Sequence, residues 1–170
     1  MASESTQADT LTPLKGIAVL GGVIVAVAAL VAIGIALHLN ALYAGFLFVL
    51  YWTGLCHAKV DDFAPALIGS LGGIAMAYGL HALPAALGEV AGMVLALGLV
   101  LLAIYALIMR WATILVNNAF MLFLTVGSIP MLMDTATLGD MALAVVVSAA
   151  YVGVLVLIGK TLASRAAAKA

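Results

Sequence analysis

The sequence predicts an all-α integral membrane protein with six transmembrane helices. Three observations lead to this fold class. Of the 170 residues, 67% are hydrophobic and 8% are charged, whereas a soluble domain has about 25% charged residues. The mean hydropathy is +1.33. Apolar runs follow one another from Leu14 to Gly159, so no polar block is long enough to form a separate soluble domain.

The boundaries of the spans follow from the thickness of the bilayer. A hydrocarbon core about 30 Å thick needs roughly 20 apolar residues of helix, and charges, Pro or Asn interrupt the runs. Residues 1–12 are polar and have no basic start, so we expect a disordered tail and not a signal peptide. We expect a six-helix membrane domain over 13–160 and a cytoplasmic tail over 161–170. The expected spans are 15–37, 41–56, 63–80, 88–109, 111–131 and 141–159.

The positions of the basic residues give an independent test of the number of spans. Lys and Arg accumulate in cytoplasmic loops of membrane proteins. With six spans, all six basic residues fall on one side, whereas five or seven spans would scatter them over both. Both termini are therefore expected in the cytoplasm. These residues are Lys15, Lys59, Arg110, Lys160, Arg165 and Lys169.

The two halves of the chain resemble each other faintly. A shift of 73 residues pairs Gly54 with Gly127 and Asp61 with Asp134. Three spans in each half would give the halves opposite orientations in the membrane, so we expect a 3+3 inverted repeat. Small residues four apart also predict close helix packing. The third span shows this pattern at Gly69, Gly73 and Ala77.

Three segments of the chain resemble a known family. They are AGFLFVLYWTGL, the start of the third span PALIGSLGG, and GDMALAVVVSAAYVGVLVLIGKTLASRAAAK. With these segments, the sequence resembles a family of small six-span bacterial inner-membrane proteins that is grouped as a domain of unknown function. The resemblance implies a multi-pass protein of the bacterial inner membrane, and it implies no activity.

Polar residues within the expected spans are the first candidates for a function. Uncompensated polar groups in hydrocarbon cost several kcal/mol, so such residues face a partner, a cavity or a pathway. We expect the side-chain amides of Asn117 and Asn118 to lie about two turns inside the fifth span. They either line a solute pathway or bond to a neighbouring helix. Near Pro130 the helix either kinks, freeing carbonyls for a solute, or simply ends. The pathway candidates are Tyr51, Thr53, Asn117, Asn118, Thr125 and Ser128.

The turn between the second and third spans has the densest group of ionisable residues. It contains His57, Lys59, Asp61 and Asp62. One interpretation is a hydrated cytoplasmic turn in which Asp62 caps the next helix. A second is a charged vestibule that selects solutes or senses pH through His57. A metal site that uses His57 and Cys56 is disfavoured, because neighbouring residues on a helix point about 100° apart.

Several classes of function are not expected from this sequence. The basic residues are scattered, which argues against nucleic-acid binding. Signatures of intramembrane catalysis are lacking, so we expect no enzyme, no catalytic residue, no metal and no cofactor. The leading hypothesis is a channel or facilitator for a small polar solute or ion, embedded in the lipid bilayer as a homo-oligomer. The alternative is a non-transporting membrane subunit or scaffold.

Overall fold

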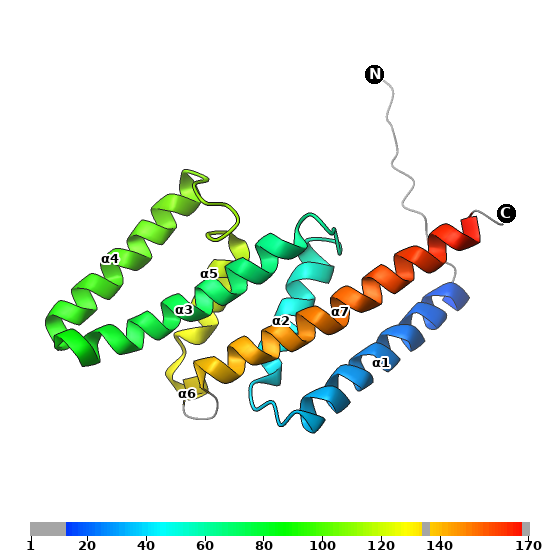
Figure 1. Ribbon diagram of the computed structural model, residues 1–170, viewed down its shortest axis with the longest axis horizontal. Helices are drawn as coiled ribbons and strands as arrows, with labels where there is room; N and C mark the ends of the chain where they lie inside the picture. Colours follow the sequence, from blue (N-terminus) through cyan, green and yellow to red (C-terminus); the bar gives the residue numbers. More distant parts are fainter. Residues whose placement is uncertain (1–12, 134–136, 168–170) are drawn as a thin grey trace, which may run out of the picture. The chain divides into compact units, whose positions relative to one another are not determined.

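The structure is a computed structural model that describes residues 13–133 and 137–167 (Figure 1). This described part has helices and turns and no strands, which confirms the all-α prediction. The chain divides into two compact units, Met1–Leu37 and His38–Ala170. The first unit has helix α1. The helices are α1 (Pro13–Ala36), α2 (Leu42–Val49), the π-helix η1 (Leu50–Leu55), α3 (Phe63–Leu87), α4 (Glu89–Ile108), α5 (Asn118–Gly127), α6 (Pro130–Met133) and α7 (Leu138–Ala167).

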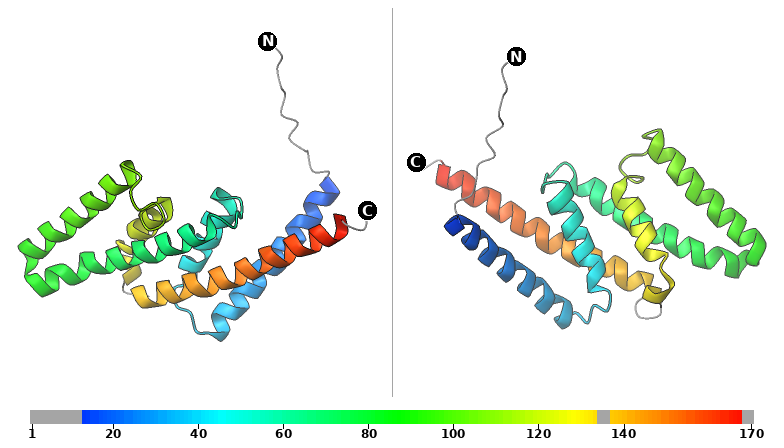
Figure 2. Two further views of the ribbon diagram at one scale, coloured as in Figure 1. Left: turned by 45° about the horizontal axis from the view of Figure 1, so that its top comes forward. Right: turned by 180° about the vertical axis from the view of Figure 1, so that it is seen from behind.

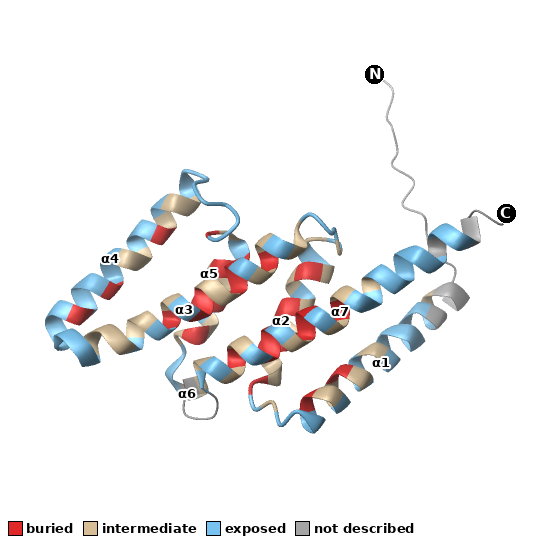
Figure 3. Ribbon diagram, viewed as in Figure 1, coloured by how far each residue is buried: buried red, intermediate tan, exposed pale blue. Residues whose placement is uncertain are grey.

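Four helices in the described residues are long and apolar enough to cross a membrane. They coincide with the first, third, fourth and sixth expected spans. The apolar side chains of α4 are largely exposed, for example Val90 at 79% and Ile108 at 71% (Figure 3). Such a surface is costly in water and favourable in lipid, so it fits a membrane protein. The membrane-length segments are Val19–Ala36, Phe63–Leu87, Glu89–Ile108 and Leu138–Leu162.

The second expected span, 41–56, agrees with α2 and η1 to within one residue at each end, whereas the fifth is shorter than the sequence predicted. Helices α2 and η1 together extend about 20 Å, and α5 extends about 15 Å, against a hydrocarbon core of about 30 Å. The prediction of one helix over 111–131 is wrong, because residues 109–117 form turns and α5 begins only after Asn117. Pro130, which has no N–H to donate, is the first residue of α6. The chain therefore has a plain helix end here.

The expected tails lie partly outside the described residues. Residues 1–12 and 168–170 are outside them, so the predicted disorder of the N-terminal tail stays a prediction. Residues 161–167, expected to follow the last span, continue α7 without a break to Ala167.

The second unit is built on two helix pairs. Helix α5 packs against α3, and α2 packs against α7, while α3 also contacts α4 and α7 (Figure 2). Large side chains from α2, η1, α5 and α7 fill the space between the pairs. The largest fully buried hydrophobic side chains are Phe48, Trp52, Phe123, Met141 and Val145.

The small-residue face that was predicted in the third span makes the α3–α5 contact. At Gly73 an added Cβ would lie 2.9 Å from the Leu124 nitrogen, and it would clash with the carbonyl oxygen of Phe120. Ala77 lies one turn further along α3. An added Cβ at Gly127 of α5 would be 2.7 Å from the Cβ of Ala77. The packing role of this face is therefore confirmed.

A pair of glycine substitutions tests this close approach. Gly73→Ala should lower the free energy of unfolding by about 1–3 kcal/mol, because its Cβ meets backbone atoms that cannot move away cheaply. The matched control is Gly98→Ala on α4, where no atom lies within 4 Å of the new Cβ. The control should leave stability unchanged or raise it by up to about 1 kcal/mol through helix propensity. Thermal unfolding in detergent micelles measures both; equal stability of the two variants would contradict the structure.

Candidate functional site: a polar cavity at one end of the second unit

The π-helix η1 places two aromatic side chains at the end of the α2–η1 helix. Its wider turn is closed by the Cys56 N–H, which donates to the Tyr51 carbonyl at 3.1 Å. The Ala58 N–H then donates to the Trp52 carbonyl at 3.0 Å. Short π-helical turns are rare and occur frequently at functional sites. Tyr51 and Trp52 each line a cavity, and the two cavities differ in chemistry.

Two adjoining polar cavities lie where η1, the start of α3 and the 109–117 turn meet. Their volumes are about 270 Å³ and 420 Å³, and both are lined by Tyr51, Thr113 and Asn117. We call them together the end cavity. Each is large enough for several water molecules. The other lining residues are Cys56, Asp62, Pro65 and Ala66 in the smaller cavity, and Leu107, Arg110, Val116 and Asn118 in the larger.

Asn117 holds the wall of the end cavity in place. Its side-chain oxygen accepts from the Phe120 N–H at 3.2 Å and so caps α5. Its Nδ2 donates to the Pro65 carbonyl of α3 at 2.8 Å, and to the carbonyls of Thr113 and Ile114 at 3.1 and 3.2 Å. The expected position two turns inside a span is wrong, because the preceding residues form turns. Of the two interpretations of the amides, a hydrogen bond to a neighbouring helix describes Asn117. The side chain of Asn118 is exposed.

The other pathway candidates do not line the end cavity. The hydroxyls of Thr53, Thr125 and Ser128 donate to carbonyls of their own helices, at 2.7, 2.8 and 2.6 Å. Serine and threonine commonly satisfy their hydroxyls this way in apolar surroundings. Thr53 lines a separate groove with Tyr43. Of the six pathway candidates, the structure brings together Tyr51, Asn117 and Asn118.

Only one of the four expected vestibule residues lines the end cavity. Asp62 does so, at the N-cap position of α3. Asp62 therefore has the expected position, but its side chain does not make the capping hydrogen bond that was expected with it. His57, Lys59 and Asp61 are exposed on the turn. His57 has a left-handed backbone with φ 54°, which turns the chain sharply after η1.

Cys56 follows the end of η1 and lines the end cavity. Burial raises the pKa of its thiol, and the nearby Asp62 carboxylate raises it further, while a hydrogen bond with Tyr51 and the charge of Lys59 lower it. The balance lies above the ordinary value, so the thiol stays protonated at neutral pH.

Arg110 and Thr113 are the residues that the sequence analysis did not identify. The sequence predicts Arg110 only as a cytoplasmic residue that sets the topology, and Thr113 falls within the expected fifth span, 111–131. One signal was present in the sequence. Arg110 stands seven residues before Asn117, and polar residues at both ends of a short apolar run indicate a turn as readily as a span.

No known protein family, curated protein or solved structure matched the chain. The family resemblance drawn from the three sequence segments therefore stays a prediction. Within residues 13–133 and 137–167, no group of three or more His, Cys, Asp or Glu side chains is placed to hold a metal ion.

The two asparagines test the role of Asn117. Asn117→Ala should lower the free energy of unfolding by about 1–3 kcal/mol, since it removes a helix cap and leaves the Pro65 carbonyl without this donor. Asn118→Ala is the matched control and should change stability by less than about 0.5 kcal/mol, because this side chain is exposed. Unfolding in detergent compares them; an unaffected Asn117→Ala protein would show that the amide is dispensable.

Alkylation of Cys56, the single cysteine in the chain, tests its surroundings. Because its pKa is raised, the rate of reaction with iodoacetamide should still be rising with pH above 9.0, the value for an unperturbed thiol. The control is the same protein unfolded in guanidinium chloride, in which the burial that causes this shift is lost. Identical pH profiles for the folded and unfolded protein would contradict the burial of the thiol.

Proposed function

We propose that this protein is a channel or facilitator for a small polar solute or ion, with the end cavity as one mouth of the pathway. One observation carries the proposal. The end cavity gathers a carboxylate (Asp62), a guanidinium (Arg110) and an amide (Asn117) in a unit whose helices are otherwise strongly apolar. Ionisable groups beside hydrocarbon are costly unless they are hydrated or paired, so such groups mark solute and ion pathways.

The lining of the end cavity suits a small solute with both donors and acceptors. Asp62 accepts hydrogen bonds, Arg110 donates them, and the hydroxyls of Tyr51 and Thr113 do both. The two opposite charges favour a dipolar or ionic solute over an apolar one. The proposal therefore covers small polar solutes and ions as a class.

The pairing of the helices supports a 3+3 inverted repeat as part of this proposal. Helix α2 of the first half packs on α7 of the second, and α5 of the second half packs on α3 of the first. In a repeat of three spans, these are equivalent pairs. The two short helices, α2–η1 and α5, also occupy corresponding positions. In transporters, a pair of short hydrophobic segments at equivalent positions of two halves points to the solute site.

The basic residues support a cytoplasmic position for the end cavity. Lys160 Nζ donates to the Ala58 carbonyl at 3.4 Å, so the later part of α7 meets the turn that contains Lys59. Arg110 lines the end cavity at the same end of the unit. By the tendency of Lys and Arg to stay in the cytoplasm, we place this end inside a bacterial cell, in the inner membrane. The exposed apolar face of α4 is available for lipid or for a second copy in a homo-oligomer.

A non-transporting subunit or scaffold is the second candidate, and one observation favours it. The side chains of Asn117, Thr53, Thr125 and Ser128 are all bonded to backbone carbonyls. Polar groups that only join or stabilise helices would be bonded in this way.

Flux measurements with purified protein in proteoliposomes distinguish the two candidates. We would use urea and glycerol in stopped-flow light scattering, and K⁺ and Cl⁻ with fluorescent reporters. Transport predicts flux of at least one probe above that of empty vesicles. Asp62→Asn should reduce this flux at least about fivefold, because it removes the negative charge of the end cavity. Asp61→Asn is the matched control, because Asp61 is the exposed neighbour and lines no part of the end cavity.

Two results would contradict the transport proposal. One is a folded protein that passes none of the four probes faster than empty vesicles do, which favours the scaffold. The other is equal flux through the Asp62→Asn and Asp61→Asn variants, which would separate any pathway from the end cavity. Asn117 is unsuitable for this experiment, because its substitution disturbs the start of α5.

A further inference from the structure

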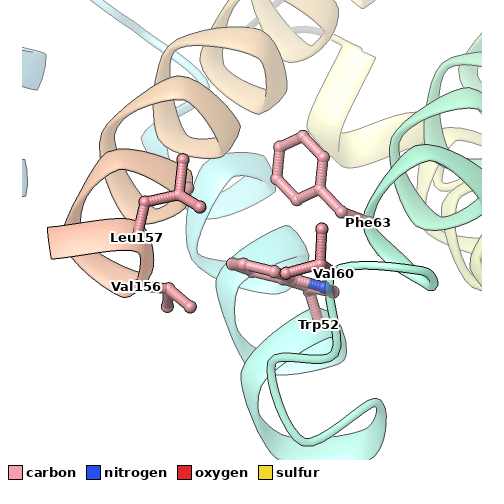
Figure 4. Close-up of a pocket in the computed structure, with 6 residues that line it drawn as sticks. Trp52, Val60, Phe63, Val156 and Leu157 are labelled. Atoms are coloured by element: carbon pink, nitrogen blue, oxygen red, sulfur yellow. The ribbon is translucent and has the colours of Figure 1, made fainter. Parts of the chain in front are cut away.

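A second, smaller cavity in the same unit is entirely apolar. Its volume is about 90 Å³, and it lies between the end of η1, the start of α3 and the later part of α7 (Figure 4). It shares no lining residue with the end cavity. No polar side chain lines it apart from the indole of Trp52. The lining residues are Trp52, Val60, Phe63, Gly153, Val156 and Leu157.

The aromatic wall of this apolar cavity is preformed. Trp52 and Phe63 pack edge to face, with ring centroids 4.8 Å apart and an interplanar angle of 73°. The indole N–H of Trp52 donates to the Lys59 carbonyl at 2.9 Å, so the one polar atom of the wall is satisfied by the backbone. The cavity therefore offers no hydrogen bond to a polar ligand, and its wall is held by the turn itself.

A glycine opens the α7 side of the apolar cavity. An added Cβ at Gly153 would lie 3.4 Å from two ring carbons of Phe63, an ordinary van der Waals contact. A small side chain would therefore fit here without strain, and a larger one would fill the cavity. Val156 and Leu157 continue this wall from α7, opposite Val60 and Phe63 (Figure 4).

Two lysines are close in the chain to residues that line the apolar cavity. Lys59 precedes Val60 in the chain, and Lys160 lies one turn after Leu157 and Val156 on α7. Both lysines are exposed, and Lys160 Nζ reaches the Ala58 carbonyl at 3.4 Å. Asp61 is the exposed acidic residue on the same turn. The Lys160 ammonium thus lies against the turn that contains Lys59 and Val60. An apolar cavity with basic residues next to its lining is complementary to a ligand with an apolar chain and an anionic head.

We infer that the apolar cavity holds part of one acyl chain of an anionic phospholipid, whose phosphate is bound by Lys160 and Lys59. Exposed apolar residues of α7, among them Leu155 and Ile158, precede Lys160, so this part of the helix passes from hydrocarbon to the headgroup region. Basic sites between transmembrane helices on the cytoplasmic side bind anionic headgroups in this way. The inference depends on the membrane position of the unit and not on transport.

Quenching of tryptophan fluorescence by brominated lipids tests this site. The chain has two tryptophans, so Trp111→Phe leaves Trp52 as the single reporter. The protein is reconstituted in phosphatidylcholine vesicles with increasing fractions of dibrominated phosphatidylglycerol or dibrominated phosphatidylcholine. We expect phosphatidylglycerol to quench Trp52 half-maximally at a mole fraction several-fold lower than phosphatidylcholine does. Equal quenching by the two lipids would overturn the inference of a bound anionic headgroup.

A charge substitution identifies the headgroup contact. Lys160→Gln should reduce the preference for phosphatidylglycerol about fivefold, the factor that corresponds to one basic residue at an anionic surface. Arg165→Gln is the matched control, because it removes the same charge from α7 five residues further on and should keep the preference. A preference that survives Lys160→Gln would overturn the assigned contact.

A glycine substitution tests the acyl-chain position. Gly153→Val should weaken quenching by both lipids, because its side chain fills the cavity. Gly159→Val is the control, since no atom lies within 4 Å of its added Cβ. Both lipids should quench Trp52 in this variant as strongly as in the parent. Absence of quenching by either lipid in the parent would overturn the inference that an acyl chain occupies the cavity.

Discussion

The hydrogen bond from the Asn117 amide to the Pro65 carbonyl connects the parts of the second unit that form the end cavity. One side chain caps α5, closes the turn that precedes it, and fixes both to the first turn of α3. The two residues are 52 positions apart in the chain. The side chain fits because Gly69 has no Cβ at the point where Asn117 meets α3. A larger residue at 69 would separate α5 from α3 and remove a wall of the end cavity.

This bond acts together with close packing to join α3 and α5. Apolar side chains gain nothing by leaving lipid for a helix interface, so helices associate through close packing and hydrogen bonds. The α3–α5 contact has both, with Gly73 and Gly127 giving the close approach and Asn117 giving the bond. The α2–α7 contact relies on packing, because an added Cβ at Gly45 would clash with Ser148. The hydroxyl of Ser148 is buried there without a hydrogen-bond partner in the described structure.

The sequence predicted the long helices and the packing faces but not the turns. Hydropathy identifies an apolar run, and Trp111 to Val116 contains only one polar residue, Thr113. The run is nevertheless not helical, because Asn117 caps the helix that follows and Arg110 and Ala112 have left-handed backbones. The spacing of small residues did predict the packing face of α3. Small residues four apart indicate close helix packing whichever helix is the partner. The partner of Asn117 lies 52 residues away, and no local pattern could reveal it.

The ionisable turn shows the same limit at the level of side chains. The sequence placed His57, Lys59, Asp61 and Asp62 together, but it could not say which of them faces inward. The left-handed conformations of His57 and Ala58 decide this, because they turn the chain so that Asp62 alone lines the end cavity. These conformations have only a weak local signal, since neither residue is glycine, although histidine adopts a positive φ more often than most residues.

The positions of these strained residues bear on what the end cavity is. A non-glycine residue in the left-handed region costs roughly 1–2 kcal/mol. In the described part of the chain, five such residues occur, and four of them lie in the two turns beside the end cavity. They are His57, Ala58, Arg110 and Ala112. If these turns only joined helices, glycine would serve at lower cost. Strain that is concentrated beside a polar cavity is more typical of a binding site than of a plain connection. The strained backbone conformations and the charged side chains thus both indicate a binding site at the end cavity.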